Sequence, residues 1–145
     1  MPGTGLTSWG ALPALEMLVS YSGQRQRILA HNVANWQTPD FRPADVAPAE
    51  FQKVLGEAVA RRRASGGLGD LAWRPARGIE RGPGGVLRLR PVTPLAEGPL
   101  RHDRNDVDLE RLMQDMTENL AVFRTATDLL RTRQALMHAA ISERV

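Results

Sequence analysis

The sequence contains no cysteine, which excludes disulfide bridges, zinc sites built from thiolates and thiol nucleophiles. Aromatic residues make up only 5% of the 145 residues, and this share argues against an ordinary compact globule although the length suits one domain. No apolar run comes near the roughly 18 residues that a membrane-spanning helix needs. Residues 1–9 lack a basic start followed by an apolar stretch, so we expect neither a membrane span nor a cleaved secretory signal.

Lysine is nearly absent too, because all but one of the 19 basic residues are arginine. Residues 61–104 hold ten arginines and four acidic residues (+6), whereas the remainder holds nine basic and twelve acidic residues (−3). A solvated loop in an arginine-rich chain explains this basic middle most simply. The alternative is a basic coiled-coil adaptor that binds nucleic acid, although such binding favours interleaved aromatic residues and Trp73 is the only one here. Its contacts would come from Arg61, Arg62, Arg63, Arg88 and Arg90.

Heptad-like spacing predicts a helix over residues 9–35. Seven positions follow one another at intervals of three and four residues: Leu12, Leu15, Val19, Ser22, Gln26, Leu29 and Val33. Five of the seven are apolar, so one face of this helix carries a stripe that must be covered. Pro13 falls in the first turn, where its missing N–H does no harm. We expect Leu15, Val19, Leu29 and Val33 to form the packing seam.

A marked stop follows this helix. Asn35 is expected to adopt the left-handed conformation that ends helices, and Thr38 precedes Pro39 and is pushed toward extended geometry. Asn32, Asn35, Thr38 and Pro39 are therefore the residues expected to shape the turn. A second, short helix is predicted from about Pro48 to Arg62. Its apolar face is formed by Phe51, Val54, Leu55, Ala58 and Val59.

Glycine and proline crowd the middle of the chain, which argues against helix over residues 63–100. Residues 86–90 alternate apolar and basic side chains, as a strand does, and residues 79–81 precede a Gly-Pro turn. We predict a small hairpin there or, failing that, irregular chain. The expected division is therefore residues 1–62, 63–104 and 105–145, acting as one assembly unit.

The most regular stripe lies near the end of the chain. Ten positions alternate intervals of four and three: Leu109, Met113, Met116, Leu120, Phe123, Thr127, Leu130, Gln134, Met137 and Ile141. A helix that covers them spans about 50 Å. Asn105 or Asp106 can cap its start. The expected seam is Leu109, Met113, Met116, Leu120, Phe123, Leu130, Met137 and Ile141.

These patterns predict a mainly α protein whose two long terminal helices pack as a coiled-coil-like pair. A stripe of this kind more often covers an internal core, but the chain has no third long helix to complete a bundle. Two helices alone leave apolar surface open, so we expect assembly with other chains through the same helices. The polar stripe residues Ser22, Gln26, Thr127 and Gln134 either fix the register or face solvent.

Chemistry-bearing patterns are weak. His31, His102 and His138 lack the spacing of metal ligands. The glycines of residues 66–69 lack the strand, helix and lysine of a phosphate-binding loop, and the acidic residues 103–110 lack the spacing of a calcium loop. We expect no catalysis, no metal and no cofactor.

Two segments resemble the flagellar rod and hook proteins. Residues 26–41, read as Q-R-I-L-A-H-N-V-A-N-W-Q-T-P-D-F, are similar to the A-N-N-I-A-N-x-x-T-P-G-Y motif that ends the first helix of that family. Residues 105–113, N-D-V-D-L-E-R-L-M, with Glu118 and Asn119, resemble the N-x-V-D-L-E-x-E-M…E-N pattern of its short, proximal-rod members. The sequence departs from the motif at Asp40 and Phe41, which stand where the family has Gly-Tyr.

This resemblance implies a structural subunit of the bacterial flagellar basal body. It implies export through the flagellar type III apparatus without a cleaved signal, and assembly in the periplasmic rod. The implied partners are copies of the chain, other rod proteins, the adaptor between rod and membrane ring, and the export apparatus. Nucleic acid is not among them.

Overall fold

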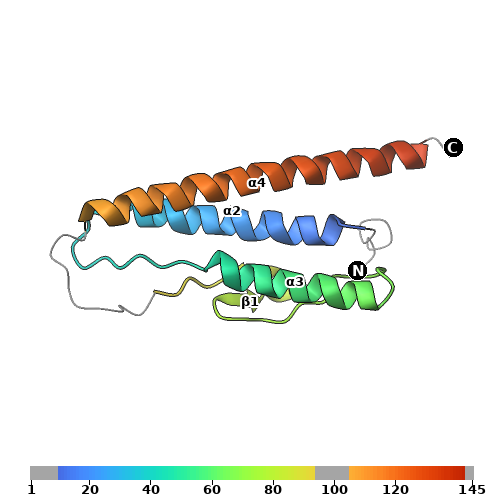
Figure 1. Cartoon of the computed structure of the whole chain (residues 1–145), viewed down its shortest axis with the longest axis horizontal. Coiled ribbons are helices and arrows are strands. Elements are labelled where there is room, and N and C mark those ends of the chain that lie inside the picture. Colours follow the sequence, from blue (N-terminus) through green and yellow to red (C-terminus); the bar gives the residue numbers. More distant parts are fainter. Residues whose placement is uncertain (1–9, 94–104, 143–145) are drawn as a thin grey trace.

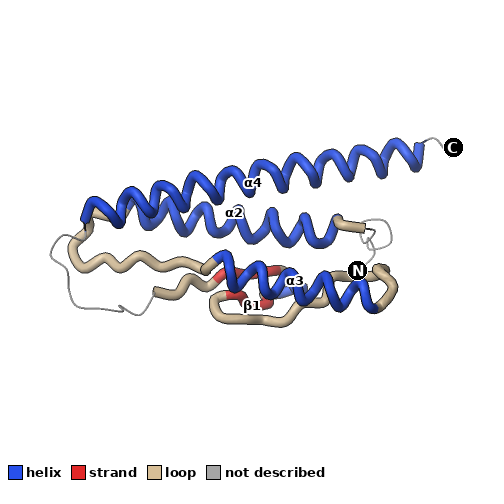
Figure 2. The backbone as a smooth tube through the Cα atoms, viewed as in Figure 1, coloured by secondary structure: helices blue, strands red, loops and turns tan. Residues whose placement is uncertain are grey.

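The computed structural model describes residues 10–93 and 105–142 and is mainly helical, as the sequence predicts. Three α-helices run nearly parallel to one long axis of an elongated molecule (Figure 1). A two-stranded hairpin lies beside the shortest of them (Figure 2). The elements are α2 (Leu12–Ala34), α3 (Pro48–Ala64), β1 (Ile79–Arg81), the 3-10 turn η1 (Pro83–Gly85), β2 (Leu87–Leu89) and α4 (Asn105–Ser142).

Helix α2 occupies the centre of the molecule, with α4 on one side and α3 and the hairpin on the other (Figure 1). Its buried side chains therefore include polar as well as apolar residues, since no broad face is left for water. Pro13 stands in the first turn, as expected, and α3 likewise starts with a proline, Pro48. The predicted ranges of these two helices are confirmed to within three residues.

The hydrophobic core lies between α2, α3 and the hairpin. Phe51 of α3 is 2% exposed, and its ring stacks on that of Tyr21 with centroids 3.9 Å apart. The other buried members are Met17, Val46, Val54, Ala58, Trp73, Ile79, Leu87 and Leu89. Residues of the Gly- and Pro-rich middle thus supply four of the core side chains, so this part of the chain belongs to the core.

The predicted hairpin is confirmed, with antiparallel pairs from Ile79–Leu89 to Arg81–Leu87. The side-chain amide of Gln24 in α2 binds the backbone of β2. Its Nε2 donates to the Leu87 carbonyl (2.8 Å), and its Oε1 accepts from the Leu89 N–H (2.9 Å). Gly78 precedes the hairpin with φ of 76°, and a Cβ there would lie 3.1 Å from the Arg90 carbonyl oxygen. Both the positive φ and the close backbone approach require glycine.

Candidate assembly interface

Helices α2 and α4 run antiparallel, because contacts farther along α2 involve residues that come earlier in α4. Gly23 faces Phe123, and a Cβ on Gly23 would lie 3.2 Å from the ring carbon Cε2. Nearer the start of α2, Leu12 lies beside Leu136 and Met137. The glycine allows the phenylalanine ring to sit directly against the α2 backbone, which sets a short distance between the two helices at this point.

One buried amide fixes the register of this pair. Asn119 is 3% exposed, and its Nδ2 donates to the Ser22 carbonyl (2.8 Å) and to Gln26 Oε1 (2.7 Å). A slide of one helix turn would leave this amide buried without partners, which costs roughly 1–3 kcal/mol. Gln26 thus takes part in fixing the register, one of the two roles considered for it. Ser22 offers only its backbone carbonyl, and its hydroxyl donates to the Leu18 carbonyl of its own helix (2.7 Å). Thr127 likewise donates to the Phe123 carbonyl of its own helix.

The predicted seam of α4 lies mostly against α2. Six of its eight residues are half-buried: Leu109, Met116, Leu120, Phe123, Leu130 and Met137. Met113 and Ile141 are exposed, at 54% and 44%. Ile141 lies past the start of α2, because α4 has 38 residues and α2 only 23, a difference of about 20 Å in length. Met113 lies off the contact, and its neighbour Leu112 is half-buried in its place.

The predicted seam of α2 is divided between half-buried and buried positions. Leu15, Val19 and Val33 are half-buried, whereas Leu29 is 1% exposed within the chain. The first three therefore keep surface that a neighbouring chain could reach, and Leu29 contributes to the interior.

A second apolar row on α4 lies beside the contact with α2 and remains exposed. Val122, Leu129 and Leu136 follow one another at intervals of seven residues and are 43%, 50% and 60% exposed. Thr125 and Thr132 fill the positions between them and are also exposed. We call Val122, Leu129 and Leu136 the outer ridge. Residues seven apart lie on one face of a helix, as the residues of a helix-packing seam do, and the sequence pattern did not predict this row.

A side chain near the end of α2 binds the backbone of the chain that returns after the turn. Asn32 is 2% exposed; its Nδ2 donates to the Ala44 carbonyl (2.8 Å) and its Oδ1 accepts from the Ala44 N–H (3.3 Å). Thr38 and Pro39 are exposed. The Thr38 N–H donates to the Asn35 carbonyl (2.9 Å), and the Phe41 N–H donates to the Thr38 carbonyl (3.1 Å). Two successive turns therefore reverse the chain, and Asn32 fixes where it returns.

The expected left-handed conformation at Asn35 is wrong. Asn35 has φ of −102° and ψ of 6°, and its Nδ2 donates to the His31 carbonyl (2.9 Å), which satisfies an end-of-helix acceptor without the conformational change. Asp40 instead has φ of 59°. This is the position where the rod and hook motif has glycine, and aspartate is among the few residues with a side chain that tolerate it.

Replacement of Asp40 by valine should therefore lower the free energy of unfolding by about 1–2 kcal/mol, because a β-branched side chain crowds the backbone at positive φ. Asp40→Gly should leave the protein equally or more stable. Urea denaturation of both variants measures the difference. Equal stability of the valine and glycine variants would contradict the conformation described for residue 40.

A partly buried ion pair ties α2 to the returning chain. The guanidinium of Arg25 donates to both carboxylate oxygens of Asp45, with the shortest contact at 2.7 Å, and the Arg25 side chain is 6% exposed. Burial alone would lower the pKa of Arg25, but the hydrogen bonds and charge of Asp45 outweigh it and raise the pKa. The Tyr21 hydroxyl donates to the Val46 carbonyl (2.7 Å), and burial raises the pKa of that tyrosine.

Asp45→Ala should lower the free energy of unfolding by about 2–4 kcal/mol, because it leaves the Arg25 charge buried without its partner. Glu80→Ala is the matched control. It removes the same charge from the pair with Arg90, whose side chains are 50% and 78% exposed, and should cost below about 0.5 kcal/mol. Thermal and urea unfolding measure both variants, and similar losses would show that burial does not distinguish the two pairs.

Several arginines of the basic middle make contacts inside the chain. Arg62 is buried and donates to the Gly10 carbonyl (2.6 Å), and Arg61 donates to the Ala72 carbonyl (3.3 Å). Arg81 donates to the Trp73 carbonyl and lies 4.8 Å from the centroid of the indole ring. These contacts give the arginines concerned a role in holding α3 and the hairpin region.

Residues 10–93 and 105–142 hold no group of three or more metal-ligating side chains close enough to share an ion. Nor is any helix there long and apolar enough to cross a bilayer. His31 and His138 are exposed, and His102 lies outside the described residues, as do the side chains of Asn105 and Asp106.

No protein-family model matches the sequence. Among curated proteins, the flagellar basal body rod protein FlgB of Yersinia enterocolitica is 29% identical over 123 residues, which are 83% of this chain and 85% of that protein. The similarity supports assignment to the flagellar rod proteins. It extends beyond the two motifs, since it spans most of both chains. The relation to FlgB supports a structural component of the basal-body rod and points away from an enzyme.

Proposed function

We propose that the chain is a proximal-rod subunit of the bacterial flagellum that assembles through α2 and α4. The exposed outer ridge carries this proposal. Three large apolar side chains at heptad spacing on a long helix match the pattern of a helix that packs against another helix. The similarity to FlgB supplies the setting, because a rod protein functions as part of an assembly.

The antiparallel pair provides a rigid unit for such packing. Asn119 and Gly23 fix the position of α4 on α2, and therefore fix where the outer ridge points. Some of the predicted seam residues are also open to neighbouring chains. Met113 and Ile141 are exposed, and Leu15, Val19 and Val33 are half-buried. When neighbouring subunits cover these side chains, apolar surface leaves the water, which stabilises the assembly by about 25 cal/mol per Å² buried.

In this proposal the chain is exported without a cleaved signal and assembles in the periplasmic rod. Its partners are further copies, other rod proteins and the adaptor that joins the rod to the membrane ring. It performs no catalysis and takes no cofactor.

Deletion of the gene tests the function. We expect the deletion strain to lack assembled rods and motility, and a plasmid copy to restore both. Mass spectrometry of basal bodies isolated from the complemented strain should detect the chain. A deletion strain that swims normally, or basal bodies that form without the chain, would refute the proposal.

A further inference from the structure

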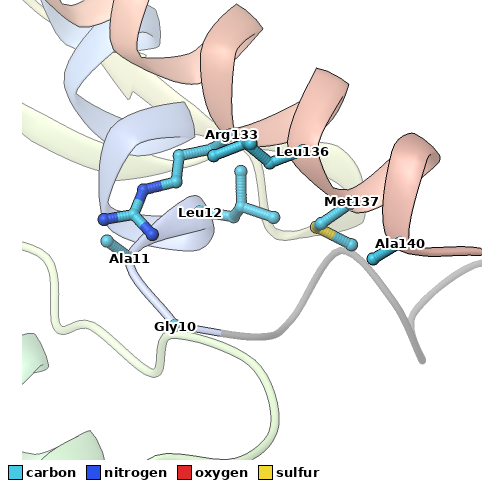
Figure 3. A pocket seen from close by; sticks show the side chains of 7 residues that line it. All are labelled: Gly10, Ala11, Leu12, Arg133, Leu136, Met137 and Ala140. Atoms are coloured by element: carbon cyan, nitrogen blue, oxygen red, sulfur yellow. The ribbon is translucent and has the colours of Figure 1, made fainter.

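A hollow of about 300 Å³ lies where α2 begins beside the last turns of α4 (Figure 3). Residues 10–12 line one side, and Leu136, Met137 and Ala140 line the other, with Arg133 also part of the lining. The hollow is thus mainly apolar and carries one cation. Leu136 is 60% exposed and also belongs to the outer ridge, so a neighbour that covers the ridge reaches the hollow as well.

The hollow lies near one end of α4, and an exposed apolar side chain lies near the other end. The last turns of α4 extend past the start of α2 (Figure 1), and Ile141 in this extension is 44% exposed. Met113 precedes Met137 by about 36 Å along the helix and is 54% exposed. An apolar hollow at one end and an apolar side chain projecting at the other allow two copies of the chain to pack end to end.

Charge decides which exposed apolar side chain suits this hollow. Among the described residues, the large apolar side chains exposed outside the outer ridge and this end of α4 are Leu68, Val86 and Met113. The first two lie within residues 61–93, which hold eight arginines and two acidic residues, so Arg133 repels their surroundings. Met113 lies within residues 105–120, which hold five acidic residues and one arginine, so Arg133 attracts its surroundings.

Glu110 supplies a counter-charge at the right place. It precedes Met113 by one helix turn, so the two side chains lie on one face of α4, and both are exposed. At the other end of the helix, Arg133 precedes Met137 by one turn and lines the hollow with it. An apolar side chain beside an acid therefore matches an apolar hollow beside a base.

We propose that a second copy of this chain packs head to tail on the first, with its Met113 seated in the hollow and its Glu110 beside Arg133. This contact rests on the proposed function and names the faces through which copies meet. Methionine is unbranched and fills irregular gaps well. Because the two faces differ, the contact leaves one free face of each kind, and repetition gives a row of copies that all run in the same direction.

Disulfide trapping in cells tests this contact, and the natural absence of cysteine makes the introduced thiols the only ones in the chain. Two differently tagged copies are produced together in the deletion strain, one with Met113→Cys and the other with Ala140→Cys. The control replaces Ala140→Cys by Ala135→Cys, which is exposed on another face of α4 at nearly the same height. We expect mild oxidation to give at least about tenfold more mixed disulfide dimer from the first pair, because a disulfide requires closely placed Cα atoms.

Charge reversal separates a second copy from any other partner. Arg133→Glu alone or Glu110→Arg alone, placed in both tagged copies, should lower the yield of mixed dimer at least about threefold, because like charges then face each other. The double reversal should restore the yield, since opposite charges face each other again across a contact between two copies. Circular dichroism of each purified variant checks that its helix content is native.

Equal yields from the two cysteine pairs would overturn the proposed contact, and where those strains also swim the proposed function still stands. Normal swimming of the deletion strain would instead refute the function itself. A double reversal that fails to restore the yield would assign Arg133 to a different protein and would overturn the contact. Dimers of identical cysteine variants in place of the mixed dimer would mean that like faces meet, and this result would overturn it too.

Discussion

Leu129→Asp is expected to abolish motility while leaving the isolated subunit folded. Leu129 is the middle residue of the outer ridge and is half exposed in the single chain, so a carboxylate there remains in water until a neighbour packs over it. Burying that charge without a partner costs several kcal/mol at each subunit contact, enough to prevent assembly. Swimming assays and electron microscopy of isolated basal bodies measure the outcome, with circular dichroism to confirm folding.

Ala135→Asp is the matched control, because it adds the same charge to an exposed position on another face of α4. Its cost in helix propensity is similar to that at position 129, about 0.7 kcal/mol or less. We expect the Ala135 variant to swim. Normal motility of both variants would argue that the outer ridge stays in water within the rod.

Phe51→Ala is expected to produce the largest loss of stability among single substitutions in the α3 core, about 3–5 kcal/mol. Phe51 is 2% exposed and stacks on Tyr21, so truncation leaves a cavity between α2, α3 and the hairpin and removes the aromatic contact. Urea denaturation measures the loss. Because the hairpin residues share this core, we expect α2, α3 and the hairpin to unfold in one transition.

Phe41→Ala serves as the control, because Phe41 is only half-buried and makes an edge contact with His31 at 5.7 Å between centroids. We expect a loss of about 1 kcal/mol. A loss at position 51 no greater than that at position 41 would mean that α3 and α2 do not share a packed core.

Periodicity alone predicted the helices, because each carries an apolar stripe that a helical repeat explains. The hairpin also followed from local signals, namely the alternation in residues 86–90 and the Gly-Pro turn before it. Trp73, by contrast, was seen only as an isolated aromatic among arginines, although it is 8% exposed in the core. The partner of such a residue is distant in sequence, so no local pattern reveals its burial.

Only part of the candidate interface could be predicted, again because the contacts join residues that are distant in sequence. A heptad stripe shows which face of α4 is apolar but not how much of it α2 covers, and the cover depends on the lengths of the two helices. Asn119 was recognised only as part of a motif, since its contacts with Ser22 and Gln26 lie more than 90 residues away. The Arg25–Asp45 pair has no signal in the sequence beyond two opposite charges. At the turn, local signals predicted the positive φ at Asn35, whereas Asn35 stays at φ of −102° and the positive φ occurs at Asp40.

Assembly through α2 and α4 depends most on the outer ridge being an interface between subunits. A density map of isolated basal bodies, in which α4 of this chain is traced, tests it most directly. We predict that Val122, Leu129 and Leu136 are buried against a helix of a neighbouring rod subunit. A map in which these three side chains face the lumen or bulk solvent would contradict the account.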